Sequence, residues 1–337
     1  MSTSIKIKYL PSTVADKEGT IYYQITHSPK TRQLLTDYKT DEYSLFNFME
    51  AIIVSMKQCG KIRTAETYKS ALNSFKRFRK NKDIMLGAID FELMENYESY
   101  LKSKGITPNT ISFYMRILRA TYNRAVAKGI TAQRRPFRNV YTGVDKTTKR
   151  ALPLSIIKKI KNIDLSSEKP LDFARDMFML SFYLRGMSFV DMAYLRKTDL
   201  RNGYVAYRRR KTSQQLVIEW TREMQSILDK YDTNPTAYLL PIIKSHQINE
   251  RNQYRNAGYN INKALKKLAK RLNISTALTM YVARHSWAST AKAKGIPISV
   301  ISEGMGHDSE TTTQIYLASL DTAVVDRANS LIIKALK

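Results

Sequence analysis

The spacing of apolar residues divides the chain into parts of different secondary structure. Residues 5–9 and 20–26 alternate apolar and polar side chains, as short strands separated by a polar turn do. From about residue 41 the apolar residues recur at helical spacing instead, and this continues to about residue 129. We therefore expect a small N-terminal β unit over residues 1–38 and a helical domain over residues 39–130.

Four helices are expected in the helical domain. The first begins near residue 45 and ends at Gly60, which supplies a left-handed stop. Its apolar face consists of Leu45, Phe48, Met49, Ile52 and Met56. The second covers about 64–78 and the third about 90–103. The fourth starts with Thr107 as N-cap and Pro108 in the first helical position, which helix starts favour.

Periodicity breaks over residues 131–152, a stretch rich in arginine and lysine. We interpret it as a basic linker, and its charge suits a strap that lies along a phosphate backbone. An ordinary solvated loop explains the same composition. On composition alone the two interpretations stay open.

Residues 153–337 alternate helical patterns with one clear hairpin. Two β-rich runs, 204–209 and 215–220, are joined by a short turn that carries Lys211 at or beside its tip. The last stretch, 322–337, is amphipathic, so it is expected to form a tail helix. That helix can pack against a neighbouring protomer or against its own chain.

Charge changes the picture from a generic globular chain to one with an anionic partner. The 337 residues include 56 Lys and Arg against 29 Asp and Glu, a net charge of +27, and 43% of them are hydrophobic. Such an excess on a foldable chain points to nucleic acid, because neutralised phosphates release condensed counterions. A ribosomal protein or a protein of anionic membrane surfaces shares this balance.

Cysteine usage and the N-terminus bear on the compartment. Cys59 is the only cysteine, which excludes an internal disulfide and a cysteine-rich zinc site. The N-terminal residues lack the apolar core of a signal peptide, and the longest apolar run, "MFMLSFYL", is too short to span a membrane. A cytoplasmic protein that does not act in a membrane is expected.

Reactive side chains occur in four places with special local geometry. "YLRGMSFVD" contains Arg185, the hairpin contains Lys211, "MYVARHSW" contains Arg284, and "GMGHDSETTTQIY" contains His307 and Tyr316. Each has a simple structural explanation when taken alone, such as an ion pair or a turn residue. Their joint occurrence in this order is harder to explain that way.

In this order and spacing the chain resembles the tyrosine recombinases, the family of phage and mobile-element integrases. The family signature has His followed nine residues later by Tyr, as His307 and Tyr316 are in "MGHDSETTTQIY". Arg284, in "ARHSW", matches the second arginine of the family, and Arg185 and Lys211 match the first arginine and the hairpin lysine. The resemblance covers about residues 41–330.

Two positions depart from the family pattern. Tyr281 stands where the family usually has a histidine, three residues before Arg284. Asp191 follows Arg185 after six residues, whereas an acidic residue commonly follows after three. This second departure resembles the integrases of conjugative or mobilisable elements, and Tyr281 is expected to contribute a hydrogen bond to a phosphate oxygen.

The resemblance implies a chemistry that these residue types suit. A tyrosine phenol attacks a DNA phosphodiester to give a 3′-phosphotyrosyl intermediate, and two guanidiniums hold the phosphate oxygens in paired hydrogen bonds. Tyr316 is then the nucleophile, and Arg185 and Arg284 bind the phosphate. Lys211 protonates the leaving 5′-oxygen, and His307 donates to the phosphate or helps to position or deprotonate the phenol. No metal and no cofactor is implied.

The resemblance also implies the fold and the partners. We expect a multidomain, mainly helical protein with an N-terminal arm-type β unit, a four-helix SAM-like core-binding domain and a mixed α+β catalytic domain. The two larger domains are expected to close round double-stranded attachment-site DNA, which a homotetramer synapses. An accessory DNA-bending or excision factor can take part. Candidate contacts to DNA in the helical domain and linker are Arg116, Arg119, Arg134 and Arg135.

Three other functions compete with integration or excision of a mobile element. A type IB topoisomerase uses the same chemistry without exchanging strands. A DNA-binding protein with reduced catalysis is indicated only by Tyr281. A basic RNA-binding or ribosomal protein explains the charge and none of the motifs.

Overall fold

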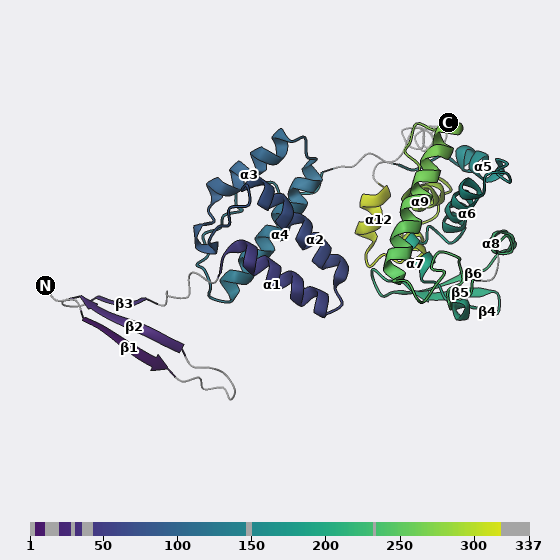
Figure 1. Ribbon diagram of the computed structural model, residues 1–337. Helices are drawn as coiled ribbons and strands as arrows, with labels where there is room; N and C mark the ends of the chain where they lie inside the picture. Colours follow the sequence, from purple (N-terminus) through teal and green to yellow (C-terminus); the bar gives the residue numbers. More distant parts are fainter. Residues whose placement is uncertain are drawn as a thin grey trace, which may run out of the picture. The chain divides into compact units, whose positions relative to one another are not determined.

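The computed structural model describes residues 4–10, 20–27, 31–35, 43–145, 150–231 and 234–317 (Figure 1). For residues 4–35, and for Ile315 and Tyr316, the description covers the backbone alone. Contacts divide the chain into two compact units, Met1–Thr147 and Thr148–Lys337, which we call unit 1 and unit 2. The boundary falls inside the stretch predicted as a linker, and the domain limits given above stay predictions.

The N-terminal strands form a three-stranded antiparallel sheet. Its order is β1 (Ser4–Leu10), β2 (Thr20–His27) and β3 (Thr31–Leu35). The alternation predicted the first two strands. It missed β3, because the sequence "TRQLL" has no regular alternation. That this sheet binds arm sites on DNA stays a prediction.

Unit 1 contains the four helices that the sequence predicted. They are α1 (Leu45–Gln58), α2 (Ile62–Phe78), α3 (Phe91–Ser103) and α4 (Pro108–Ala127), with a 3₁₀ turn, η1 (Leu86–Ala88), between α2 and α3 (Figure 1). Helix α2 packs against the other three. Four helices around one apolar interior are therefore the scaffold of this unit.

Local capping explains most of the helix ends. The Ser44 hydroxyl accepts from the Asn47 amide at 3.4 Å, and Gly60 has φ +71°, the left-handed stop that the sequence indicated. Thr107 does occupy the N-cap position of α4, but its side chain makes no capping bond and lies 3.1 Å from the Thr110 hydroxyl. The fixed φ of Pro108 is thus the stronger signal for this helix start.

Aromatic residues fill the interior of unit 1. The Phe75 ring meets the Tyr97 ring edge to face, with centroids 5.0 Å apart. The buried Tyr97 hydroxyl lies 2.8 Å from the Ser74 hydroxyl, so its polar atom is satisfied. Burial raises the pKa of Tyr97 above its usual range. These rings come from α2 and α3, and their contact joins the two helices.

Part of the predicted linker is packed structure. Residues 130–145, which we call the strap, run back over unit 1. Phe137 and Val140 are buried in its core, and the Ser112 hydroxyl donates to the Gly143 carbonyl at 2.5 Å. Phe137 and Val140 are therefore not solvated, while the exposed arginines of the strap stay predicted contacts to DNA. The packing of the strap could not be predicted from the sequence, because its apolar residues, Phe137 and Val140, are too few to form a periodic pattern.

Unit 2 is built around one buried helix. Helix α6 (Lys169–Tyr183) packs against α9 (Glu250–Arg271) and α10 (Met280–Ala293). The remaining helical elements are α5 (Leu154–Asn162), α7 (Phe189–Ala193), η2 (Lys197–Asp199), α8 (Arg222–Leu228), α11 (Ile298–Met305) and α12 (Glu310–Leu317). The predicted tail helix at 322–337 lies outside the described residues.

A small antiparallel sheet carries the predicted hairpin. Its order is β4 (Leu200–Arg201), β5 (Tyr204–Arg208) and β6 (Gln215–Glu219). Residues of β5 and β6 alternate between exposed and buried, and Val205 pairs with Ile218 on the inner face. The hairpin prediction is confirmed, with Lys211 exposed in the turn.

Within the described part of the chain, no helix has both the length and the apolar content that crossing a membrane requires.

The strap provides a test of how unit 1 is stabilised. Replacing Phe137 with Ala removes a buried ring that meets Tyr122 at a centroid distance of 6.2 Å. We expect a loss of about 3–5 kcal/mol in the free energy of opening of α4, the usual cost of truncating a buried Phe. Hydrogen exchange of α4 amides in the full chain measures it. Val144→Ala is the control, because Val144 is 71% exposed on the same strap. Equal exchange in both variants would contradict the role of the strap.

Candidate active site

Arg284 is the centre of the predicted site. It lies on α10, is only 5% exposed, and its guanidinium donates to two carbonyl oxygens: Gly186 at 2.8 Å and Met305 at 2.7 Å. A third contact, 3.0 Å long, joins its Nη2 to Nε2 of His307. One side chain thus connects the loop after α6, the end of α11 and the histidine that follows it.

The loop after α6 approaches Arg284 so closely that only glycine fits. Gly186 has φ +74°, and a Cβ built on it would lie 2.8 Å from the Cα of Arg284. Arg185 also has a positive φ, +56°. A Cβ on Gly304 would lie 3.7 Å from Cδ of Arg185, so the Arg185 side chain reaches α11 at this position. The structure therefore brings Arg185, Arg284 and the His307 segment together.

His307 is held by a turn and by one buried hydroxyl. Gly306 ends α11 with φ +65°, and the His307 amide donates to the Ser302 carbonyl at 3.0 Å. Nδ1 of His307 lies 2.7 Å from the hydroxyl of buried Thr313 on α12. An arginine can only donate, so Nε2 accepts from Arg284 and Nδ1 carries the hydrogen.

The charges around His307 keep its imidazole neutral. Burial, followed by the charges of Arg284, Arg209 and Lys211, lowers the pKa of His307 to about 4. In this arrangement Nε2 has no hydrogen to donate to an anion, because it already accepts one from Arg284. The side chain is therefore an acceptor in this structure, and its role toward a phosphate or a phenol stays a prediction.

The hairpin places Lys211 beside this cluster through a residue that the sequence did not single out. Arg209, 6% exposed, donates from Nη1 to the Gly306 carbonyl, and the Thr212 hydroxyl reaches the same oxygen at 3.3 Å. Strand alternation was the available signal. Val205 and Tyr207 face inward, so the next inward position is Arg209.

Asp191 holds the other side of the hairpin base. This buried carboxylate accepts from the Arg210 amide at 3.0 Å and from the Ser188 hydroxyl at 2.6 Å. Among its contacts in the described residues there is no ion pair with Arg185, the pairing that the simple structural explanation offered. Asp191, six residues after Arg185, therefore anchors the hairpin.

Tyr281 lies at the surface near Arg284. It is 54% exposed and meets His285 edge to face, with ring centroids 4.5 Å apart. Burial and the charges of Arg150 and Arg284 lower the pKa of His285 to about 4. Tyr281 is therefore accessible to a ligand, whereas the neighbouring imidazole is neutral and half-buried.

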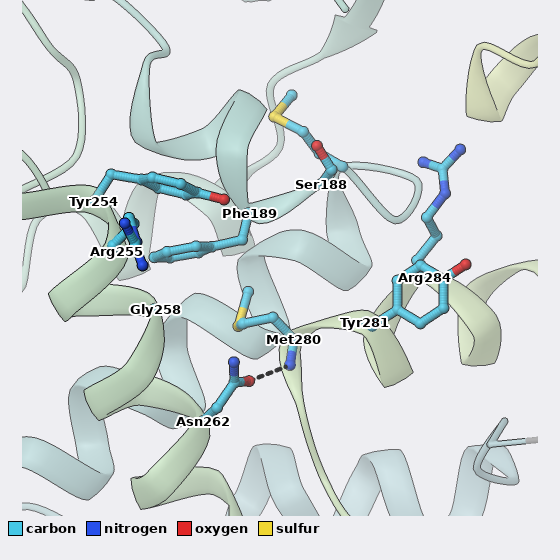
Figure 2. Close-up of a pocket in the computed structure, with 10 residues that line it drawn as sticks. Ser188, Phe189, Tyr254, Arg255, Gly258, Asn262, Met280, Tyr281 and Arg284 are labelled. Atoms are coloured by element: carbon cyan, nitrogen blue, oxygen red, sulfur yellow. Dashed lines mark hydrogen bonds between the residues drawn. The ribbon is translucent and has the colours of Figure 1, made fainter. Parts of the chain in front are cut away.

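A cavity of about 380 Å³ opens beside these residues, between α7, α9 and α10 (Figure 2). Tyr281 and Arg284 form one end, and the stacked rings of Phe189 and Tyr254, 5.6 Å apart, form the other. Gly258 lets α9 approach, because a Cβ there would lie 3.0 Å from the Phe189 ring. The cavity is thus continuous with the arginine cluster and has an aromatic wall.

Tyr316 lies on α12, three residues after Thr313. Its side chain lies outside the part of the chain that the structure describes. The backbone places it on the helix that follows the His307 turn.

The four arginines predicted to contact DNA lie in unit 1. Arg116 is exposed on α4, and Arg119 on the same helix reaches the Thr142 hydroxyl of the strap at 3.4 Å. Arg134 and Arg135 are exposed at the start of the strap. None of them belongs to the cluster in unit 2, and their role in DNA binding stays a prediction.

Comparison with known proteins links both units to one family. Residues 155–323 match the model of the phage integrase family, and residues 44–140 match that of the phage integrase SAM-like domain. Tyrosine recombinase XerC of Thermodesulfovibrio yellowstonii is 25% identical over 286 residues, which cover 82% of this chain and 91% of the relative. Tyrosine recombinase XerA of Pyrococcus furiosus is 25% identical over 240 residues, 68% of this chain and 78% of its own.

Solved structures show the same fold. A lambda integrase dimer bound to a COC′ core site superposes with a TM-score of 0.63 at 16% identity and covers 82% of this chain and 98% of its own. The Tn1549 transposon integrase in complex with a circular intermediate DNA gives a TM-score of 0.62 at 15% identity, covering 85% of this chain and 99% of its own. The mainly helical architecture with a SAM-like and an integrase domain is therefore confirmed.

The close approach at Gly186 predicts a large effect of one methyl group. Gly186→Ala places a Cβ against the Arg284 backbone, in addition to the roughly 1–2 kcal/mol that a left-handed alanine costs. Gly203→Ala is the matched control, since Gly203 has φ +76° and nothing within 4 Å of the added Cβ. The temperature at which unit 2 unfolds, measured in the full chain, is expected to fall further for Gly186→Ala than for Gly203→Ala. Equal shifts would refute the packing constraint.

The two neutral histidines predict a pH dependence of stability. Their pKa values of about 4 in the folded state lie below the ordinary value of about 6.5, so the unfolded chain binds protons more readily. The free energy of unfolding of unit 2 should therefore fall as the pH drops from about 6.5 to about 4. Urea unfolding at several pH values measures this, and His285→Phe should flatten the dependence. A His307 resonance that titrates near pH 6.5 would contradict the assignment.

Proposed function

The chain belongs to the phage integrase family and is a tyrosine recombinase, and from this premise we propose that it integrates or excises a mobile genetic element. It recombines DNA at specific sites through a covalent 3′-phosphotyrosyl intermediate. The observation that carries the proposal is the position of Arg284, whose guanidinium joins the loop of Arg185 to His307. Lys211 lies on a hairpin fixed to the same turn.

The cluster of cations around Arg284 can bind a phosphate anion. Arg284 is a buried cation, Arg185 is half-buried and Lys211 is exposed. Buried Arg209, whose Nη1 donates to the Gly306 carbonyl, adds positive charge to this cluster without contacting the phosphate. Their charge is strong enough to depress the pKa of His307. A phosphodiester bound here is stabilised by hydrogen bonds from planar guanidiniums, which a lysine provides less well. The same cations stabilise the extra charge that develops on the phosphate oxygens during attack.

Each step of strand cleavage has a residue in this scheme. The Tyr316 phenol oxygen attacks phosphorus, the bond from phosphorus to the 5′-oxygen breaks, and a phosphotyrosyl bond at the 3′ side forms. Lys211 gives a proton to the departing 5′-oxygen, which would otherwise leave as an alkoxide. A 5′-hydroxyl of the partner strand reverses the attack, so the bond energy is conserved and no metal or cofactor is assigned a role.

His307 accepts the phenolic proton once the phosphate is bound. Nε2 is engaged by Arg284 in the free chain. When Arg284 turns a hydrogen toward a phosphate oxygen, Nε2 is released and faces a less positive surrounding. Both changes raise its basicity, because the charges that lower the pKa of His307 are then partly neutralised. Tyr281, exposed beside Arg284, donates a hydrogen bond to a phosphate oxygen.

The partners follow from the family and the charge. We propose double-stranded attachment sites as the substrate, with Arg116, Arg119, Arg134 and Arg135 contacting the DNA backbone. A homotetramer holds two duplexes together, as a solved lambda integrase tetramer holds a Holliday junction. The protein acts on DNA in the cytoplasm. An accessory DNA-bending or excision factor assists it.

A nicked attachment-site duplex tests the mechanism. Wild-type chain is expected to form a protein–DNA adduct that resists denaturant, without Mg²⁺ or ATP, because the nick lets the cleaved end diffuse away. Tyr316→Phe should form none. Denaturing gel electrophoresis measures the adduct. An adduct with Tyr316→Phe refutes the nucleophile, and nicking and closing without strand exchange would favour a type IB topoisomerase.

Tyr281 is tested by restoring the residue usual in the family. If Tyr281 contributes only a hydrogen bond to phosphate, Tyr281→His keeps or raises the cleavage rate, while Tyr281→Phe lowers it by roughly 10-fold, the loss of one hydrogen bond to a charged group. Single-turnover cleavage of the nicked duplex measures both. A wild-type rate in Tyr281→Phe would exclude a contact between its hydroxyl and the substrate.

A further inference from the structure

The carbonyl of Gly306 is the point where the hairpin meets the turn before His307. Arg209 Nη1 and the Thr212 hydroxyl both donate to this single oxygen. The side chains of Leu216 and Arg209 also pack closely against Gly306. A Cβ on Gly306 would lie 3.0 Å from Leu216 Cδ1 and 3.1 Å from Arg209 Cδ. The absence of a side chain at Gly306 thus permits this contact as well as the left-handed φ.

Arg209 occupies a costly place for a charged side chain. It is 6% exposed, and its Nε is buried without a hydrogen-bond partner among the described residues. A buried guanidinium with one nitrogen unsatisfied destabilises the fold, so an apolar residue at this inward position would be the stable choice. This free-energy cost indicates that Arg209 serves the contact it makes with the Gly306 carbonyl.

The contacts of Arg209 fix the hairpin from within. Its amide donates to the Gln214 carbonyl at 2.8 Å, and its carbonyl accepts from the Ser213 amide at 2.8 Å, so it closes the turn that carries Lys211. On the outer side, Asp191 accepts from the Arg210 amide at 3.0 Å. The turn therefore has two anchors in the body of unit 2, one at Gly306 and one at Asp191.

We propose that Arg209 is a positioning residue, which fixes the Lys211 hairpin to the Gly306 turn. It thereby keeps Lys211 and His307 in a fixed position relative to each other and to a bound phosphate. The inference rests on the proposed role of Lys211 as the general acid. Helix α12 begins four residues after Gly306, so a shift of this helix changes the Gly306 carbonyl and, through Arg209, the hairpin. The proton donor is then in place only when the segment that leads to Tyr316 is also in place.

A sulfur atom at the leaving position separates positioning of Lys211 from other roles. A thiolate leaves without protonation, because thiols have a pKa of about 8.5 while an alkoxide has a conjugate acid closer to water, about 15.7. Nicked attachment-site duplexes are prepared with either oxygen or sulfur at the 5′-bridging position. Lys211→Ala is expected to cleave the oxygen duplex ~100-fold or more slowly and the sulfur duplex at nearly the wild-type rate.

Arg209→Met should behave like Lys211→Ala if the inference is right. We expect a similar loss on oxygen, on the order of 100-fold, and restoration on sulfur. Thr212→Val, which removes the weaker bond to the same carbonyl, is a milder second variant with the same pattern and a smaller loss. Arg201→Met is the control, because Arg201 is exposed on β4 of the same sheet and loses the same charge. Restoration of Lys211→Ala but of neither Arg209→Met nor Thr212→Val by sulfur would overturn the inference and indicate that Arg209 binds the phosphate itself.

Hydrogen exchange of the full chain tests the contact without reference to catalysis. Peptides that cover 205–216 and 301–309 should both exchange faster in Arg209→Met and Thr212→Val than in wild type, Lys211→Ala or Arg201→Met. Unchanged exchange overturns the inference whatever the kinetics show. Failure of sulfur to restore Lys211→Ala, with faster exchange in Arg209→Met, refutes the general acid of the proposed function and leaves the positioning contact supported.

Discussion

Burial of the Arg284 guanidinium is the constraint on which the arrangement of unit 2 depends. A guanidinium cannot lose its proton, so its hydrogens need acceptors wherever it is buried. Two of them are carbonyls left free where helices end: Gly186 in the loop after α6, and Met305 at the last position of α11. A helix C-terminus carries partial negative charge, which favours a cation there. The loop and the helix end are therefore held at fixed distances from α10, and the histidine turn follows from them.

Features that depend on neighbours in sequence could be predicted. The helices of unit 1 follow from apolar spacing, from the stop at Gly60 and from Pro108. The hairpin follows from alternation. The proximity of Arg185, Arg284 and His307 came from resemblance to a family, since no local rule brings residues 100 positions apart together. The structure bears out their proximity, and their catalytic roles stay predictions.

Features that depend on contacts between distant segments could not be predicted. Phe137 was assigned to a linker because one aromatic in a basic stretch has no periodicity, whereas the groove that receives it is made by α4 and its neighbours. The sequence does not single out Arg209, because an arginine at the end of an amphipathic strand normally turns to solvent. Only the carbonyl of Gly306, 97 residues later, gives its side chain a reason to turn inward. Asp191 had a known spacing but no known partner for the same reason.

The cations that would bind a phosphate are also the ones that keep His307 neutral. Burial and, after it, these cations hold the pKa of this imidazole near 4 while no anion faces them, and Arg284 occupies its Nε2. A histidine in that state is a weak base, so the free chain has little means of deprotonating a phenol. An anion placed among the arginines weakens both obstacles at once, since it neutralises their charge and competes for the hydrogen of Arg284, while the effect of burial remains. In the proposed mechanism the site therefore gains its base from its substrate, and a phenol that reaches it without bound DNA stays protonated. This coupling needs no moving domain, because it follows from the charges and one hydrogen bond.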